Sequence, residues 1–283
     1  MSNINNTIKL NSENTQVLIV DGQISSFKFG DDELFHTAGL SLDDIAPQDW
    51  KLSELNMFPI VGPTDSNYLV HNGEFKFPLD QHGISRVIPF YFESGNPSSA
   101  HFIQNYKGEI IENPKKNREG HPEYISWLPF KLSKSIKLSN GLMEVNFNIE
   151  NTGAETMNYQ FGWHPAFKIN GDIDSGKLID NNNQEYRLTD LLENGAPKTM
   201  KLSNVDTMSY QNSNIGFEMK SSGFGNYMIW CPNNNASMFC VEPVTSFPAS
   251  ETERDYFKNP SQGLVLKPGE SRNFSVTIKN INY

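Results

Sequence analysis

The chain has 283 residues and a formal net charge of −10, and 37% of its residues are hydrophobic. This acidic balance argues against nucleic acid or an anionic membrane as a partner, because both require gathered positive charge. With 19 Phe, 10 Tyr and 4 Trp, the chain holds enough aromatic rings for a large core, which favours β-structure. We expect one domain over residues 1–283, since β-sandwiches of this length are commonly single.

The first residues and the two cysteines bear on where the protein works. The N-terminal stretch lacks the basic flank and apolar run of a secretory leader, and no apolar run approaches the roughly 18 residues that span a bilayer. Cys231 and Cys240 are too few for a disulfide framework and are expected to be free thiols in neighbouring strands. We therefore expect a cytoplasmic protein.

The first part of the chain reads as short strands. Residues 7–35 alternate strand-like runs with Asn-, Asp- and Gly-containing breaks, which is typical of a β-meander. Residues 35–51 have no clear period and are expected to form a loop or a short helix. A hairpin is predicted over residues 68–77, because Asn72 and Gly73 make the strongest short hairpin turn.

The rest of the chain continues this pattern. Strands are predicted over residues 87–92 and 124–138, with a long polar excursion over 93–123 between them. Residues 141–150 give the clearest strand signal, because apolar and polar residues alternate there, and a closing strand is predicted over 274–278. No repeat or long amphipathic helix is present, so the predicted fold class is all-β.

The stretch Met157–Ile169 places one histidine on an aromatic strand. Alternate residues up to Trp163 are apolar and face a core, whereas the residues between them, ending at His164, are polar or glycine. Pro165 follows, cannot donate to a sheet ladder and favours extended geometry at His164. We therefore expect the His164 imidazole at the end of a strand.

Two other polar residues share this kind of setting. His82 precedes Gly83 in a turn-like segment, and Glu242 ends an otherwise apolar strand before Pro243. A lone histidine is more often a satisfied core or rim residue, and a carboxylate of this kind is often half of a structural ion pair. Linear catalytic, phosphate-binding and zinc-binding motifs are absent from the sequence, so the residues alone leave both interpretations open.

Five segments, taken together, carry a family resemblance. They are FPIVG at 58–62, PLDQHGISR at 78–86, VNFNIENTGAETMNYQFGWHPAF at 145–167, FCVEP at 239–243 and LVLKPGESRNFSVTI at 264–278. Their order and spacing resemble the aldose 1-epimerase (galactose mutarotase-like) family, in the branch of LacX-type proteins, over nearly the whole chain. The resemblance implies a large antiparallel β-sandwich, the galactose mutarotase-like supersandwich, with a hexose bound on one sheet.

The resemblance also assigns catalytic roles. It implies that Glu242 is the catalytic base, that His164 is the catalytic acid and that His82 is a second hydrogen-bonding imidazole. A sugar ring opens when the anomeric hydroxyl loses its proton while the ring oxygen gains one, which suits a carboxylate and an imidazolium. A nearby carboxylate is expected to raise the protonated fraction of His164. This chemistry requires no metal or organic cofactor.

Substrate contacts are less well defined. Members of the family commonly carry an arginine just after the FPxVG run, where this chain has Pro63. Arg86 is a candidate replacement, with a surface or structural role as the alternative. Gln81, Trp163 and Asp80 are further candidates, although an aromatic ring such as Trp163 is more often part of a core.

The leading hypothesis is an aldose 1-epimerase that acts on a free hexose as a monomer or homodimer. A hexose-6-phosphate 1-epimerase is the close alternative and would need Arg or Lys side chains around a phosphate. A non-catalytic sugar-binding protein is favoured by Pro63 at the arginine position. A zinc hydrolase with His82, His164 and Glu242 as ligands is formally open, whereas a glycosidase would need a second facing carboxylate.

Overall fold

The computed structural model describes most of the chain. The described residues are 7–37, 54–64, 67–139, 141–169, 171, 173–193, 196–212, 215–233, 236–249, 256–257 and 263–281. Most of the loop or short helix predicted over 35–51 therefore lies outside the described residues. Within these ranges two short 3-10 helices, η3 (Ile173–Ser175) and η4 (Leu188–Leu191), interrupt the strands. Within the described ranges, no helix has the length and apolar character needed to cross a membrane.

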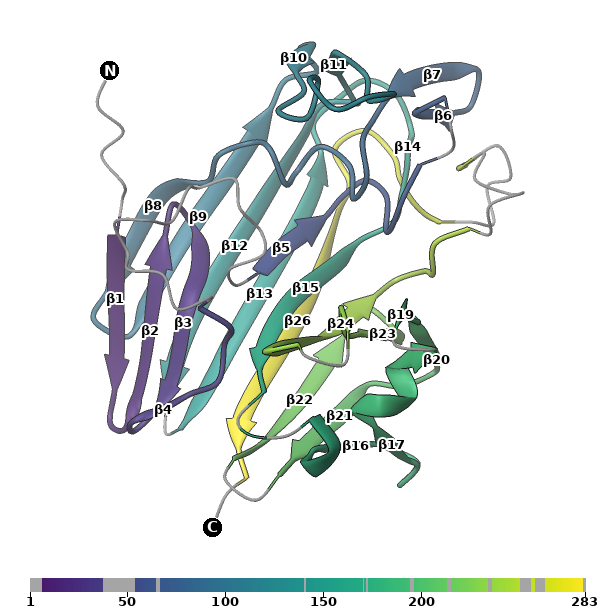
Figure 1. Ribbon diagram of the computed structural model, residues 1–283. Helices are drawn as coiled ribbons and strands as arrows, with labels where there is room; N and C mark the ends of the chain where they lie inside the picture. The colour runs from purple at the N-terminus through teal and green to yellow at the C-terminus, as the bar shows by residue number, and fades with distance from the viewer. Residues whose placement is uncertain are drawn as a thin grey trace.

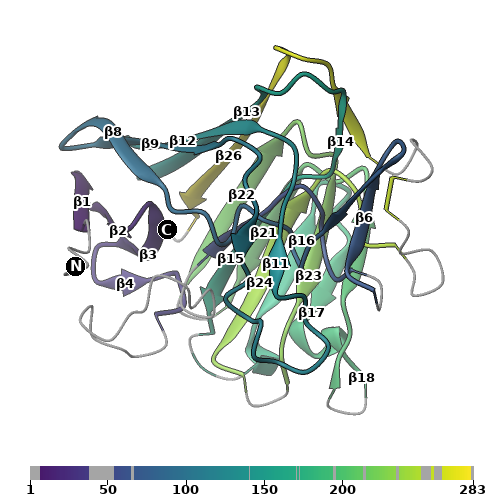
Figure 2. The same cartoon turned by 90° about the horizontal axis from the view of Figure 1, so that it is seen from above.

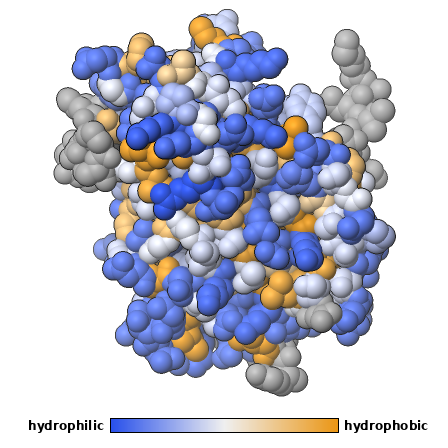
Figure 3. Space-filling model, turned by 180° about the vertical axis from the view of Figure 1, so that it is seen from behind, coloured by the Kyte–Doolittle hydropathy of each residue, from blue (hydrophilic) through white to orange (hydrophobic). Residues whose placement is uncertain are grey.

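A nine-stranded antiparallel sheet forms one layer of the molecule (Figure 1). The outward Lys, Ser, Asn and Glu side chains of its central strands alternate with buried residues, and this face of the molecule is largely hydrophilic (Figure 3). In spatial order the strands are β17 (Glu185–Arg187), β16 (Lys177–Asp180), β21 (Thr207–Gln211), β22 (Gly216–Ser222), β26 (Ser271–Asn280), β13 (Leu142–Asn151), β12 (Phe130–Ser139), β9 (Ser99–Tyr106) and β8 (Tyr91–Asn96).

Two smaller sheets and four two-stranded pairs make up the rest of the fold among the described residues (Figure 2). The four-stranded sheet contains β1 (Thr7–Ser12), β2 (Thr15–Val20), β3 (Gln23–Phe29) and β4 (Asp32–Glu33). The five-stranded sheet contains β20 (Met200–Ser203), β23 (Asn226–Trp230), β24 (Met238–Val244), β15 (Gly162–Lys168) and β5 (Glu54–Met57). The two-stranded pairs are β6 (Leu69–Asn72) with β7 (Phe75–Pro78), β10 (Ile111–Glu112) with β11 (Tyr124–Ile125), β14 (Met157–Tyr159) with β25 (Leu264–Leu266), and β18 (Leu192–Glu193) with β19 (Ala196–Pro197).

An aromatic core joins the five-stranded sheet to the nine-stranded sheet. Phe147 on β13 contacts Phe161 and Trp163, with ring centroids 5.2 Å and 6.2 Å apart, and Phe167 stacks on Phe217 of β22 at 4.2 Å. Each buried aromatic ring removes a large apolar area from water, so these contacts fix which face of β15 points inward. The alternate residues of β15, including the candidate histidine, therefore lie on the outer face of the five-stranded sheet.

A buried ion pair occupies the seam where the four- and five-stranded sheets meet the nine-stranded sheet. Lys134 of β12 donates to a carboxylate oxygen of Glu54 on β5 and to the carbonyl oxygen of Gly22, 3.1 Å away. The indole N–H of Trp163 donates to the other oxygen of Glu54, and the backbone N–H of Ile24 donates to the first. Both charged side chains are about 1% exposed, so the polar groups satisfy one another instead of water.

Several predictions about the fold are confirmed. The β-meander over residues 7–35 forms β1 to β4, the hairpin over 68–77 forms β6 and β7, and the strand over 141–150 is β13. Cys231 and Cys240 are buried free thiols. The large antiparallel sheets agree with the all-β sandwich that the resemblance implied.

The predictions between residues 87 and 138 are partly wrong. Residues 87–90 do not form a strand and β8 begins at Tyr91, so the β8–β9 hairpin occupies much of the predicted polar excursion. The alternating burial of β9 is obscured in the sequence because Gln104 occupies a core position. Its amide donates to the carbonyl oxygens of Ser85 and Ile88, and its oxygen accepts from the Ser85 hydroxyl. The strand predicted over 124–138 is broken into β11 and β12.

Candidate active site

His164 and Glu242 lie on adjacent strands, β15 and β24, in the middle of the five-stranded sheet (Figure 1). The antiparallel register places them directly opposite each other, as the flanking pairs show: Gly162 with Val244 and Ala166 with Cys240. The Nε2 atom of His164 lies 3.4 Å from Oε1 of Glu242. Two groups remote in the sequence are thus brought into contact on the outer face of the sheet.

His164 lies inside a strand and not at the end of one, which corrects the sequence prediction. Pro165 belongs to β15, where it lies opposite Glu54 of β5. On the other side, the ladder between β15 and β24 is interrupted between its flanking pairs, where Pro165 and Pro243 lack an N–H. The histidine is therefore presented at a gap in the hydrogen-bond ladder.

Burial dominates the proton affinities of the pair. Glu242 is 1% exposed and His164 is 6% exposed. Burial raises the pKa of Glu242 well above its ordinary value, because a carboxylate loses the solvation of its charge. Burial, with a smaller contribution from the charge of Arg86, lowers the pKa of His164. The net pKa of His164 is thus lowered by burial, not raised as expected from a nearby carboxylate.

One carboxylate oxygen of the pair is available to a ligand. Oε1 of Glu242 faces His164, whereas Oε2 is buried and has no hydrogen-bond partner among the described residues. An unpaired buried acceptor is costly, and native proteins retain one mainly where there is local strain, a catalytic role or a bound water or ion. Oε2 can therefore accept a hydrogen bond from a bound ligand.

His82 approaches the pair from a tight turn between two loops. His82 and Gly83 both have positive φ, 64° and 74°. The backbone N–H of Phe58 donates to the His82 carbonyl oxygen at 3.1 Å, and the His82 N–H donates to the carbonyl oxygen of Gly62 at 2.8 Å. These bonds hold the His82 ring edge-to-face against the His164 ring, with centroids 5.5 Å apart.

Hydrogen bonding fixes the tautomer of His82. Its Nδ1 accepts from the backbone N–H of Gly62 at 3.1 Å, so in the neutral ring the proton resides on Nε2. The side-chain amide of Gln81 lies 3.2 Å from Nε2. With the amide turned so that its oxygen faces Nε2, it accepts a hydrogen bond from the Nε2–H group. Burial lowers the pKa of His82 well below its ordinary value. His82 is thus a neutral imidazole with a directed N–H.

Asp80 is held by its own partners rather than directed at the pair. Its carboxylate accepts from Asn113 Nδ2 at 3.0 Å, from His121 Nδ1 at 2.8 Å and from the Gln81 N–H at 2.6 Å. Lys115 Nζ lies 3.6 Å away. Burial alone would raise the pKa of Asp80, but the hydrogen bonds from His121 and Asn113 and the charge of Lys115 lower it. Asp80 therefore anchors the segment that carries His82.

Arg86 lies close enough to act electrostatically on the site. Its Nη1 donates to the carbonyl oxygen of Gln81 at 3.3 Å, and its charge lowers the pKa values of His82 and His164. Gln81 is exposed and Arg86 is half-buried. Both predicted residues thus lie beside the imidazoles.

Trp163 lies on the opposite face of β15 from His164. Its side chain is fully buried in the core against Phe35 and Phe147, and its N–H is bound to Glu54. Alternation along a strand explains this position, since neighbouring residues point to opposite faces. We therefore do not retain Trp163 as a substrate contact.

Three residues at or near the site, Cys240, Asn113 and His121, were not among the candidates from the sequence. Cys240 points to the same face as Glu242, and one donor atom from each of Cys240, Glu242 and His164 lies within 4.8 Å of the other two. The alternation of FCVEP carried this signal. The zinc set of His82, His164 and Glu242 considered from the sequence is not retained. Among the described residues, the donor atoms that meet belong to His164, Cys240 and Glu242, and Nδ1 of His82 accepts from Gly62, so its Nε2 carries the proton and has no lone pair for a metal. Asn113 and His121, which bind the Asp80 carboxylate, lie in the segment predicted to be a polar excursion.

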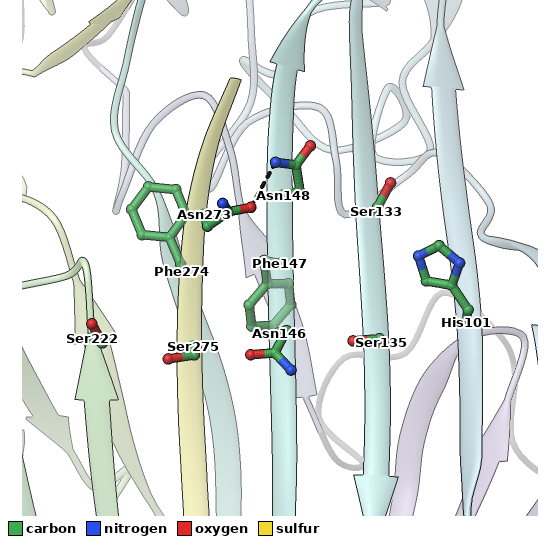
Figure 4. Close-up of a pocket in the computed structure, with 10 residues that line it drawn as sticks. All are labelled: His101, Ser133, Ser135, Asn146, Phe147, Asn148, Ser222, Asn273, Phe274 and Ser275. Carbon is green, nitrogen blue, oxygen red and sulfur yellow. Dashed lines mark hydrogen bonds between the residues drawn. The ribbon is translucent and has the colours of Figure 1, made fainter. Parts of the chain in front are cut away.

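A separate depression of about 350 Å³ lies on the outer face of the nine-stranded sheet (Figure 4). Neutral hydroxyl and amide groups from neighbouring strands surround it, including Asn148, whose amide donates to the Asn273 oxygen at 2.7 Å. His101 is its titratable group and is paired with Glu93 at 2.6 Å. None of the predicted site residues lines it, so the paired acid and base identify the other sheet as the candidate active site.

Solved structures similar to this chain define its fold. No family model and no curated protein sequence matches the chain. A galactose mutarotase related enzyme from Lactobacillus acidophilus is 18% identical with a TM-score of 0.77, covering 98% of this chain and 97% of that one. A galactose mutarotase-like protein from Lactobacillus casei is 16% identical with a TM-score of 0.72, covering 97% and 99%. An aldose epimerase homologue from C. elegans is 10% identical with a TM-score of 0.63, covering 98% and 100%.

The chain therefore has the galactose mutarotase-like sandwich fold. The family resemblance of the sequence and the structural likeness agree, and they extend over nearly the whole chain. The LacX-type branch stays a prediction.

Proposed function

We propose that this protein is an aldose 1-epimerase that interconverts the α and β anomers of a free hexose. The observation that carries the proposal is the contact between a buried imidazole and a buried carboxylate, 3.4 Å apart on one face of the sheet. The two oxygens that exchange protons during ring opening are bonded to the same sugar carbon. Their acid and base must therefore be close neighbours, as His164 and Glu242 are.

In the forward reaction Glu242 accepts the proton of the anomeric hydroxyl while His164 donates a proton to the ring oxygen. The C1–O5 bond breaks and the open-chain aldehyde forms. Rotation about the C1–C2 bond exposes the other face of the carbonyl group. Reversal of both proton transfers then closes the opposite anomer, and each positioned transfer contributes about 10²–10⁴ in rate.

The pair needs one proton in total to start this cycle. Burial raises the pKa of Glu242 and lowers that of His164, so it favours the neutral pair, with the proton on Glu242. Transfer of the proton to His164 produces the carboxylate and the imidazolium without any exchange with solvent. A sugar hydroxyl that binds Oε2 favours this form, because a hydrogen bond to a carboxylate stabilises its charge.

His82 and Arg86 complete the site as polar contacts to the sugar. The Nε2–H of His82 is a fixed hydrogen-bond donor beside His164. It can donate to a sugar oxygen when the Gln81 side chain moves away from it. The proposal includes a monomer or homodimer in the cytoplasm, with a small sugar as its ligand.

Polarimetry of freshly dissolved α-glucose and α-galactose tests the proposal. We expect wild type to hasten the approach to anomeric equilibrium and Glu242→Gln to do so at least about 100-fold less, the lower end of one lost proton transfer. The matched control is Glu185→Gln, which removes an exposed carboxylate on β17 and should keep full activity. If wild type leaves the spontaneous rate unchanged but binds sugar, the protein is a non-catalytic sugar-binding protein.

A hexose 6-phosphate is the second candidate substrate, and a specific cluster favours it. Burial lowers the pKa values of Arg86 and Lys115, the charge of Arg118 lowers both further, Arg86 also lowers that of Lys115, and Asp80 is the opposing charge. The cluster adjoins His82, whose pKa both Arg86 and Lys115 lower. If phosphate is recognised there, Lys115→Met should raise KM for glucose 6-phosphate and leave KM for glucose unchanged.

A further inference from the structure

Cys240 is the third side chain at the acid–base pair, and the proposed reaction does not use it. It lies two residues before Glu242 on β24 and points to the same face. One donor atom from each of His164, Cys240 and Glu242 lies within 4.8 Å of the other two, and all three residues are buried. An imidazole nitrogen, a thiol and a carboxylate thus meet at one point.

These three groups are ligands that zinc accepts in proteins. Zinc bonds of about 2.0–2.3 Å to nitrogen, oxygen and sulfur place the donor atoms of a tetrahedral site about 3.2–3.8 Å apart. The His164 nitrogen and the Glu242 oxygen are already 3.4 Å apart. The sulfur atom of Cys240, which lies within 4.8 Å of both, therefore needs only a small movement to close the set.

The donor set also selects the class of cation. A thiolate and an imidazole favour borderline and soft ions such as zinc, whereas magnesium and calcium prefer oxygen ligands. The other buried thiol, Cys231, is not part of this donor group: it packs in the main core, whereas Cys240 packs in a separate cluster with Ala166 and Met238. The chain thus provides a matched pair of cysteines for a test.

We propose that His164, Cys240 and Glu242 form an inhibitory binding site for zinc or a similar thiophilic divalent cation. The thiol loses its proton to solvent as the metal–sulfur bond forms, and Glu242 likewise binds as the carboxylate. The ion occupies the lone pair of His164 and an oxygen of Glu242, and water completes the coordination. Neither residue can then transfer a proton to a sugar. The inhibition rests on the proposed epimerase function, but the binding itself does not.

Cobalt(II) is the probe for binding, because a cobalt–thiolate bond gives a charge-transfer band in the near ultraviolet. The reduced full-length protein is titrated with cobalt(II), and zinc inhibition of mutarotation is measured in parallel. We expect one cobalt per chain with the band in wild type and in Cys231→Ser. Cys240→Ser should lack the band and bind at least about 100-fold more weakly, since losing even an outer-shell partner costs about 10–100-fold.

Cys240→Ser and Cys240→Ala should both keep most of the mutarotase activity and lose most of the zinc inhibition. Circular dichroism of each variant confirms that it is folded before the titration. The inference is overturned if wild type binds no cobalt, or if the band persists in the folded Cys240 variants. If the band depends on Cys240 but wild type has no mutarotase activity, the metal site stands and the proposed function fails.

Discussion

Gly83→Ala tests whether the turn around His82 positions the site. Gly83 has a φ of 74°, and an added Cβ would lie within 3.0 Å of the Phe58 carbonyl group and of the Pro59 ring, a spacing that real side chains do not adopt. The Phe58 carbonyl oxygen accepts from the N–H groups of Ile84, at 2.8 Å, and Ser85, at 3.2 Å. Relief of the clash must therefore displace a carbonyl that two backbone donors share.

The expected cost has two parts. A non-glycine residue in the left-handed region costs about 1–2 kcal/mol. Loss or distortion of the two hydrogen bonds at the Phe58 carbonyl adds about 0.5–1.5 kcal/mol for each. We therefore expect Gly83→Ala to lower the free energy of unfolding by about 2–5 kcal/mol, as measured by urea denaturation. Activity should also fall in the variant that remains folded, because the His82 ring loses its position against His164.

Gly73→Ala is the matched control for this experiment. Gly73 also has a positive φ, 61°, but an added Cβ there meets nothing within 4 Å. It should therefore show only the conformational part of the cost, about 1–2 kcal/mol, and keep full activity. Equal destabilisation by the two substitutions would refute the argument that the Phe58 contact holds the His82 turn.

Two further predictions concern charge. Burial raises the pKa of Glu242 and lowers that of His164. We therefore expect His164 and Glu242 to share one proton at pH values both below and above the ordinary histidine pKa. We expect kcat/KM for mutarotation, after subtraction of the spontaneous rate, to stay flat as pH falls through 6.5; a transition with that midpoint would contradict the pairing. Lys134→Met should lower the free energy of unfolding by about 3–5 kcal/mol, because it leaves Glu54 buried without a counter-charge. The double variant with Glu54→Gln should be more stable than Lys134→Met alone in the same urea titration, and equal stability would show that the stranded charge is not the cause.

Local sequence patterns were sufficient to predict the strands in which buried and exposed residues alternate. Residues 141–150 and the Asn72–Gly73 turn were predicted correctly because each signal lies within a few neighbouring residues. β8 was misplaced because all its residues are exposed, so an edge strand of this kind has no apolar face to detect. The buried Lys134 on β12 also breaks the apolar pattern, and only the three-dimensional position of Glu54 explains it.

The site required information that local patterns do not contain. Alternation along β15 correctly separated Trp163 from His164, since the first is in the core and the second on the outer face. It could not show that Glu242 lies opposite His164, because that contact depends on the register of two strands about 80 residues apart in sequence. The family resemblance supplied this pairing, and the coordinates supply its 3.4 Å geometry.

The two prolines beside the pair explain how a sheet can hold an acid and a base at its centre. Pro165 and Pro243 each follow a candidate catalytic residue and remove one donor from the strands that carry it. The ladder between β15 and β24 is interrupted there, while β24 remains paired with β23 through Glu242 and Pro243. The strand that carries each side chain is thus held by backbone hydrogen bonds on its other side, whereas the hydrogen bonds between β15 and β24 are missing at the pair. We infer that rigidity at the site comes from the pairing of His164 with Leu55 on β5 and of Glu242 with Met228 on β23.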